Sequence, residues 1–331
     1  MQYSILDLAP VPEGGTTAGA LAASLDLARE ADALGYHRYW LAEHHNLPGI
    51  ASAATAILIG QIAAVTRRIR VGAGGIMLPN HAPYRVAEEF GTLATLFPGR
   101  IDLGLGRAPG GDAAVMQALR CGLGAERFPD DVLELLAYLG PRREDAAVHA
   151  HPGEGTDVPV WILGSSLYGA SLAAAFGLPY AFASHFAPAE LEGARDLYRA
   201  RFQPGPWGEA PRFMLAVNLV CAPTDEEAAF LRSSAQLSFA RLRTGRPGLL
   251  PPPVANVGAE VPAAVLRQVD QALGVAAIGS PETVTAEIAR LTERHHPDEI
   301  ILTGNIWDPR KRRESFRLAA AALGLRAAEP A

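Results

Sequence analysis

The chain has 331 residues, 49% of them hydrophobic and 19% charged, which gives it enough apolar material for a large globular core. A net charge of -6 and an isoelectric point near 5.9 exclude the basic surface that nucleic-acid binding requires. Cys121 and Cys221 stand alone, which excludes a disulfide framework and a CxxC zinc site, and Lys311 is the only lysine, which argues against Schiff-base chemistry. Because we find neither a secretory leader nor a membrane span, we expect a cytoplasmic protein.

Apolar runs alternate with helical patterns along the chain. The runs that predict strands are 3–8, 37–44, 69–78, 101–106, 159–163, 180–183, 213–221 and 299–302. The patterns that predict helices include 17–34, 52–65, 83–96, 113–119, 129–139 and 170–176. Mostly apolar strands separated by helices are typical of a parallel sheet covered on both faces, so we predict a closed (β/α)8 TIM barrel. A doubly wound open sheet is the alternative, but the loop after the first strand lacks a GxGxxG fingerprint.

The barrel is expected to form one domain over residues 1–331, with an insertion at 244–279. This segment contains Pro251, Pro252, Pro253 and several glycines, and it precedes the last predicted strand. Long insertions of this kind serve either as lids over a site or as rigid decorations of the fold. The composition is compatible with both alternatives.

The predicted strand 101–106 is followed by Arg107 and by the turn-forming run Pro109-Gly110-Gly111-Asp112. Gly104 and Gly106 alternate with leucines, so they share one face, where a bulky group can approach the backbone. A guanidinium at the exit of a barrel strand is suited to binding a phosphate or carboxylate. The alternative is that Arg107 pairs with a nearby carboxylate of the protein.

The second predicted strand ends in Glu43-His44-His45-Asn46. Neighbouring side chains on a strand point to opposite faces, so only one of the two histidines can share a face with Glu43. A metal site is disfavoured because the HExxH spacing is missing. Imidazole titrates near neutral pH, and we select His44 as the candidate acid or base.

The third predicted strand contains Gly74 and Gly75. Adjacent glycines in a buried strand are unfavourable unless a flat ligand lies against the backbone or an uncommon dihedral angle or cis bond is needed. A β-bulge at the barrel rim is the alternative.

The fifth predicted strand runs through Gly164, Ser165, Ser166 and Tyr168 into a helix. Free amides at a helix start, together with two hydroxyl groups, form a cradle for an anion. The alternative is that one serine simply caps the helix. Because strands four and five adjoin in a barrel, this cradle and Arg107 are expected to hold one phosphate.

Four of these motifs together resemble the bacterial-luciferase-like flavin-dependent monooxygenases: the strand end at 40–45, the glycine strand 71–79, the segment 99–107 and Gly164-Ser165-Ser166. The resemblance runs in order from residue 3 to about 185 and continues more weakly to the last helix. It implies a (β/α)8 barrel that binds FMN at the strand exits. Reduced FMN (FMNH2) and O2 would form a C4a-peroxyflavin there, which oxygenates an apolar organic substrate.

The resemblance also assigns roles to individual residues. Arg107 with Gly164, Ser165, Ser166 and Tyr168 would bind the FMN phosphate, and Arg127 is a further candidate cation that can equally be a surface charge. Gly74-Gly75 would match a non-prolyl cis peptide bond under the flavin ring. His44 would act near the reacting flavin, supported by Glu43, and no residue is assigned to a metal.

Further expectations concern the partners of the protein and the residues that shield the site from water. The family implies a separate flavin reductase and a homodimer that packs through helices 52–65 and 83–96. Met77, segment 244–279 and Trp307 are expected to keep water from the site. Two positions depart from luciferase: Gly106 stands where luciferase has a cysteine, and Gly164 stands where it has an acidic residue. We therefore expect oxygenation, whereas the resemblance does not imply light emission. A deazaflavin-dependent hydride-transfer enzyme and a non-catalytic flavin-binding protein are the alternatives.

Overall fold

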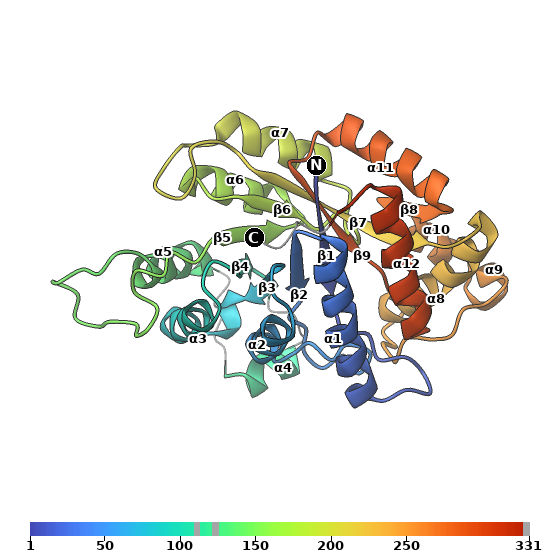
Figure 1. Ribbon diagram of the computed structural model, residues 1–331, viewed down its shortest axis with the longest axis horizontal. Helices are drawn as coiled ribbons and strands as arrows, with labels where there is room; N and C mark the ends of the chain where they lie inside the picture. Colours follow the sequence, from blue (N-terminus) through green and yellow to red (C-terminus); the bar gives the residue numbers. More distant parts are fainter. Residues whose placement is uncertain (109–112, 121–125, 327–331) are drawn as a thin grey trace.

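The computed structural model describes residues 1–108, 113–120 and 126–326, and eight of its parallel strands close into a barrel (Figure 1). These strands are β1 (Gln2–Asp7), β2 (Arg38–Leu41), β3 (Arg70–Met77), β4 (Ile101–Gly106), β5 (Val160–Gly164), β6 (Tyr180–Phe182), β7 (Phe213–Cys221) and β9 (Glu299–Thr303). The ring closes because β9 pairs with both β7 and β1. The predicted barrel is therefore confirmed, and each predicted strand overlaps one barrel strand. Pro109–Asp112 and Cys121 lie outside the described residues.

A ninth strand, β8 (Ala276–Gly279), lies outside the barrel and is absent from the prediction. It pairs with Asn218–Cys221, the outer part of β7, whereas β9 pairs with Met214–Asn218. The segment 244–279 thus contains regular structure, because it also includes α9 (Val257–Glu260) and α10 (Ala263–Ala272). The run Ala-Ala-Ile-Gly has only four residues and shows too weak a hydrophobic pattern to predict a strand.

Helices surround the barrel, and their ends follow local chemistry. The first, α1 (Thr17–Leu34), has its predicted bounds: the Thr16 hydroxyl accepts a hydrogen bond from the Gly19 amide, and Gly35 ends the helix at φ 89°. The others are α2 (Thr55–Val65), α3 (Pro83–Leu96), α4 (Ala113–Ala118), α5 (Phe128–Leu139), α6 (Leu167–Phe176), α7 (Leu191–Arg201), α8 (Asp225–Arg243), α11 (Pro281–His295) and α12 (Pro309–Ala322). None of the helices in the described part of the chain is both long and apolar enough to cross a membrane.

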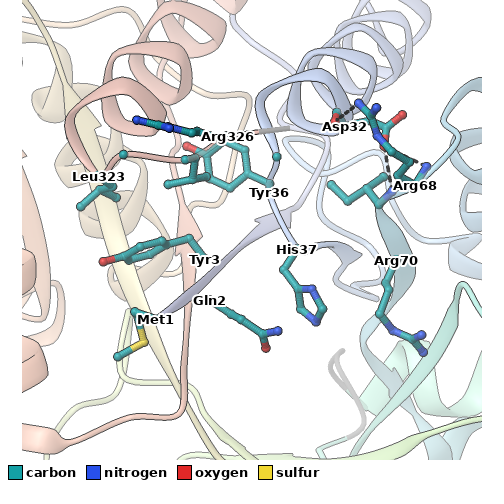
Figure 2. A pocket seen from close by; sticks show the side chains of 14 residues that line it. Met1, Gln2, Tyr3, Asp32, Tyr36, His37, Arg68, Arg70, Leu323 and Arg326 are labelled. Atoms are coloured by element: carbon teal, nitrogen blue, oxygen red, sulfur yellow. Dashed lines mark hydrogen bonds between the residues drawn. The ribbon is translucent and has the colours of Figure 1, made fainter. Parts of the chain in front are cut away.

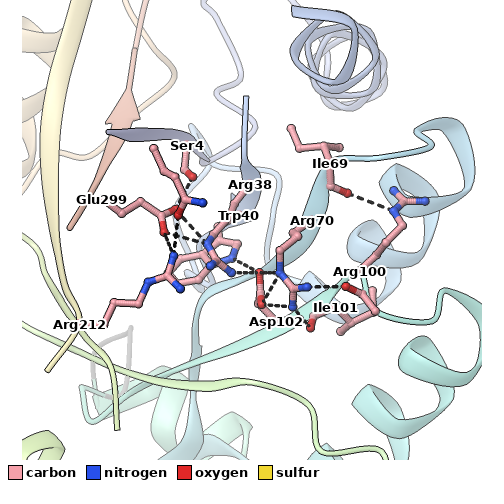
Figure 3. Close-up of polar contacts among 12 residues, drawn as sticks. Ser4, Arg38, Trp40, Ile69, Arg70, Arg100, Ile101, Asp102, Arg212 and Glu299 are labelled. Atoms are coloured by element: carbon pink, nitrogen blue, oxygen red, sulfur yellow. Dashed lines mark hydrogen bonds and ion pairs between the residues drawn. The ribbon is translucent and has the colours of Figure 1, made fainter. Parts of the chain in front are cut away.

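The strand starts are joined by a buried ionic network (Figure 3). Arg38 lies between two carboxylates, 2.6 Å from Asp102 and 2.9 Å from Glu299. Arg70 pairs with Asp102 at 2.5 Å, and Arg212 pairs with Glu299 at 2.9 Å. Both carboxylates and Arg38 are buried, so the two ion pairs of Arg38 are screened little by water and salt, whereas Arg70 and Arg212 are partly exposed. The side chains of this network thus occupy the strand-start end of the barrel.

Candidate functional site

A cavity of about 470 Å³ opens at the strand exits, and most of the predicted site residues line it. They come from four exits: Glu43 and His44 after β2, Gly74 and Gly75 within β3, Arg107 after β4, and the segment 164–168 after β5. In the β4–β5 pairing, Gly106 lies opposite Leu163, so the chain leaves both strands at the same level. Arg107 and Ser165 therefore meet at one rim of the barrel, and the volume suits a small-molecule site.

Arg107 and the start of α6 form the cationic part of this cavity. The guanidinium lies 4.0 Å from the centre of the Tyr168 ring, and it forms no ion pair with a carboxylate among the described residues. Ser166 is the N-cap residue of α6, yet its side chain makes no capping hydrogen bond. The hydroxyl and the first amides of α6 thus remain available to an anion, which fits a phosphate better than a simple helix cap.

The glycines of β3 and β4 bring bare backbone to the cavity wall. The Gly74–Gly75 peptide bond is cis, as the resemblance implies, and the β3–β4 register shifts between Ala73 and Ile76. A Cβ atom on Gly75 would lie 2.6 Å from the Gly104 carbonyl oxygen, so a side chain has no room there. Gly106 lines the cavity, whereas at Gly104 the group that approaches the backbone closely is the Ala73 carbonyl of β3 together with the Leu163 side chain.

Glu43 is the centre of a buried hydrogen-bonded cluster that does not include His44. Its Oε1 atom lies 2.7 Å from Nε2 of His45 and 2.9 Å from Nε2 of His81, and its Oε2 accepts the Met77 amide at 3.0 Å. Burial alone would raise the pKa of Glu43, but these hydrogen bonds lower it below its ordinary value. Among the described residues Glu43 makes no hydrogen bond to His44 and instead orients the two other histidines, so its support of His44 stays a prediction.

Two further histidines reach the cavity as neutral groups. The Nδ1 atoms of His44 and His185 are both buried without a hydrogen-bond partner. Burial lowers the pKa of His44, Glu43 opposes this shift, and His45 adds to it. Burial also lowers the pKa of His185, to about 3, with a smaller contribution from His44. At neutral pH both imidazoles are uncharged, so His44 can accept a proton, as an acid or base candidate requires.

The cavity is covered from the side of α8 and the 244–279 segment. Leu250 and Leu273 of this segment line it, together with Phe239 and Leu242 of α8. Leu250 also exchanges backbone hydrogen bonds with Val11 and Glu13, which fixes this part of the cover to the loop after β1. Met77 lines the cavity as expected.

Two predicted residues lie elsewhere. Trp307 is not part of the cavity lining among the described residues, and its indole N–H donates to the Glu13 carbonyl at 3.0 Å. The side chain of Arg127 is 71% exposed and lies 3.6 Å from Asp131, and it too is outside that lining. The geometry favours the surface-charge alternative for Arg127.

A second hollow of about 440 Å³ lies at the strand starts and contains none of the predicted site residues (Figure 2). Tyr3, His37 and Arg70 line it. Two of the three arginines that line it are engaged by the protein, because Arg70 donates to Asp102 and Arg68 donates to the Asp32 carbonyl. The cavity at the strand exits is therefore the candidate site.

A family model described as luciferase-like monooxygenase matches residues 1–296 of the chain. The chain belongs to this family. A luciferase-like monooxygenase of Escherichia coli (strain K12) is 49% identical over 319 residues, which cover 96% of this chain and 95% of the relative. The solved structure of apo-MsnO8 is 37% identical and covers 98% of both chains, with a TM-score of 0.87. The luciferase-like fold and family that the motifs resemble are thus confirmed.

Two less similar solved structures share the luciferase-like fold and show the cofactor types it accommodates. The oxygenating constituent of 3,6-diketocamphane monooxygenase from Pseudomonas putida, in complex with FMN, is 18% identical with a TM-score of 0.70 and covers 97% of this chain and 96% of its own. An F420-dependent secondary alcohol dehydrogenase is 16% identical with a TM-score of 0.63 and covers 97% of this chain and 98% of its own. Structural neighbours of this luciferase-like barrel therefore include both FMN and F420 enzymes.

Several polar residues of the site were not selected from the sequence, among them His81 and His185. His81 follows the strand that contains Gly74 and Gly75, and only folding brings it to Glu43, 38 positions earlier. His185 follows the short strand β6, and a lone histidine in a loop carries no pattern of its own. The available signal for both was their position just after a barrel strand, where functional side chains collect.

Proposed function

We propose that this luciferase-like monooxygenase binds FMN at the strand exits and uses reduced FMN and O2 to oxygenate an apolar organic substrate. The observation that carries the proposal is the convergence of Arg107, Ser165 and Ser166 at one rim, beside the bare Gly74–Gly75 backbone and His44. A cation that forms no ion pair with a carboxylate in the described part of the chain, next to free helix amides, suits the terminal phosphate of FMN. The glycine backbone leaves a flat surface for a ring.

Different residues of the chain would bind the cofactor, exclude water and transfer a proton. Arg107 and the start of α6 bind the phosphate, Tyr168 holds the guanidinium in place, and the apolar walls exclude water. His44 takes up or returns a proton at its ring nitrogen. When bound, reduced FMN supplies two electrons to O2, so that one oxygen atom enters the substrate and the other leaves as water.

The test starts with purified protein. FMN and a deazaflavin cofactor are titrated separately, followed by reduction of the bound cofactor, exposure to labelled O2 and analysis of products. We expect FMN to bind and labelled oxygen to enter an apolar aldehyde, ketone or aromatic substrate. Preference for the deazaflavin, with hydride transfer and no labelled product, would favour the second candidate. FMN binding without oxygen uptake would favour a non-catalytic flavin carrier.

His44→Ala provides the matched test of catalysis. It should retain FMN affinity and lower turnover by about 100-fold or more, the range of a lost acid or base. His149→Ala is the control, because His149 bonds Glu154 at 2.6 Å and does not line the cavity among the described residues. Equal turnover in wild type and His44→Ala would contradict the role of His44.

Two partners belong to the same proposal. A separate reductase would supply reduced FMN, and removing it from a coupled assay should stop oxygenation. A homodimer would cover α2 and α3, where Ile57 is 70% exposed and Leu96 is 65% exposed. Light scattering should show a dimer, and Ile57→Glu should shift it toward the monomer.

A further inference from the structure

The wall of the cavity formed by α8 and the exits of β6, β7 and β9 has no assigned role. It carries His185, Asn218, Ser238 and Asn305 among apolar side chains. Arg107 and Glu43 are the only charged residues among the described residues that line the cavity. Arg107 belongs to the proposed phosphate site, and Glu43 is occupied by His45, His81 and the Met77 amide. The described part of the wall therefore offers hydrogen bonds but no charge.

His185 is the group on this wall with a buried side-chain nitrogen that has no hydrogen-bond partner among the described residues. Its Nδ1 atom is buried and unpaired, which leaves Nε2 as the ring atom that can meet a bound molecule. The Asn218 side-chain amide donates to the His185 carbonyl at 2.6 Å, and the Phe186 ring lies edge-on to the imidazole at 4.8 Å. The backbone and ring are thus held in place, as a recognition group needs to be.

The charge state of His185 fits this use. Burial is the main cause that lowers the pKa of His185 to about 3, and His44 adds to the effect. The ring is therefore neutral at physiological pH and carries one donor and one acceptor. A neutral ring can bind an uncharged carbonyl or hydroxyl group without adding a buried charge, whereas a carboxylate would be buried against no opposite charge on the described wall.

We propose that this wall binds the substrate and selects an uncharged organic molecule with one hydrogen-bonding group, which His185 holds. The inference rests on the proposed oxygenase function and names the substrate class of the same cavity. Asn218 fixes the His185 backbone, and the side chains of Phe239 and Leu242 cover the apolar part of the molecule. Charged substrates with the same carbon skeleton are excluded by the cost of desolvating them.

The experiment compares three matched probe sets on the FMN-loaded protein. The sets are straight-chain and aromatic methyl ketones, the same ketones bearing a carboxylate, and the corresponding hydrocarbons. Dissociation constants are measured from changes in the bound-flavin spectrum. We expect at least one ketone to bind about tenfold or more tightly than its carboxylate, since an unpaired buried charge is strongly unfavourable. Equal or tighter binding of the carboxylates, or binding of none of the ketones, would overturn the proposal.

Variants of His185 test whether its side chain contacts the bound substrate. His185→Leu should weaken ketone binding about tenfold and leave hydrocarbon binding unchanged, whereas His185→Gln, whose amide reaches the position of Nε2, should retain most of it. His295→Leu is the control, because His295 also has a buried, unpaired Nδ1 atom but lies on α11 outside the cavity lining. Unchanged ketone binding in His185→Leu would refute the contact. FMN affinity is measured in every variant, and failure of the wild type to bind FMN would refute the proposed function instead.

Discussion

The Arg107 guanidinium lies over the face of Tyr168, 4.0 Å from the ring centre. Arg107 follows β4 and Tyr168 lies in the first turn of α6, so the contact joins two neighbouring strand exits. The ring restrains the cation while leaving its N–H groups free for a phosphate. Restraint before binding lowers the entropy lost when a ligand is bound.

Tyr168→Leu should therefore weaken FMN binding two- to fivefold, because a partly exposed cation–π contact contributes about 0.5–1 kcal/mol. Tyr168→Phe keeps the ring and should bind FMN as the wild type does. Fluorescence quenching during an FMN titration measures both. Equal losses in the two variants would show that the hydroxyl, not the ring face, matters.

Glu43→Gln should destabilise the protein. The carboxylate accepts hydrogen bonds from two histidines and the Met77 amide, and loss of a charged acceptor costs about 1.5–3 kcal/mol. Since the folded pKa of Glu43 lies below its ordinary value, this stabilisation is present at neutral pH and is lost as pH falls through the folded pKa. Urea unfolding of both proteins at neutral and acidic pH measures the difference. A difference that grows as the pH falls below the ordinary pKa of a glutamate, where His81 with its Glu43-raised pKa is already protonated, would contradict this assignment.

Much of the barrel could be predicted because its strands are apolar runs flanked by turn residues. Arg107 and the serine cradle stand directly at strand exits and the Gly74–Gly75 pair lies within a strand, so for each of them a local pattern is enough. The contacts of Glu43 could not be predicted in the same way, since His81 joins the cluster from another loop. The contact between Glu43 and His45 could nevertheless have been predicted, because residues two positions apart share a face of an extended chain.

His185→Gln should make the protein more resistant to acid. The folded state keeps His185 neutral down to about pH 3, whereas the unfolded chain protonates it below an ordinary histidine pKa. Between these limits the wild type loses about 1.4 kcal/mol of stability per pH unit through this group. Urea unfolding over a series of pH values measures the slope. His151→Gln, at a side chain that is 69% exposed, is the control and should leave the slope unchanged.

Asp102→Asn should destabilise the barrel by about 3 kcal/mol or more, because it removes the carboxylate partner of Arg70 and leaves Arg38 with Glu299 as its single counter-charge. Asp26→Asn is the matched control. It breaks exposed pairs with Arg29 and Arg313, and it should cost less than about 1 kcal/mol. Thermal and urea unfolding compare the variants. FMN affinity should be unchanged in Asp102→Asn, since the network lies at the strand starts, and a large loss of affinity would contradict the separation of the two ends.

The most direct measurement compares the affinity for FMN with that for riboflavin, which lacks the phosphate, in the wild type, Arg107→Ala and Arg127→Ala. We predict that the wild type binds FMN about tenfold or more tightly than riboflavin, in line with about 1.5–3 kcal/mol for a charge-assisted hydrogen bond. Arg107→Ala should remove most of this preference, and Arg127→Ala should keep it. Equal affinities for FMN and riboflavin in the wild type, or an undiminished preference in Arg107→Ala, would contradict a flavin bound by its phosphate at the rim formed by β4 and β5.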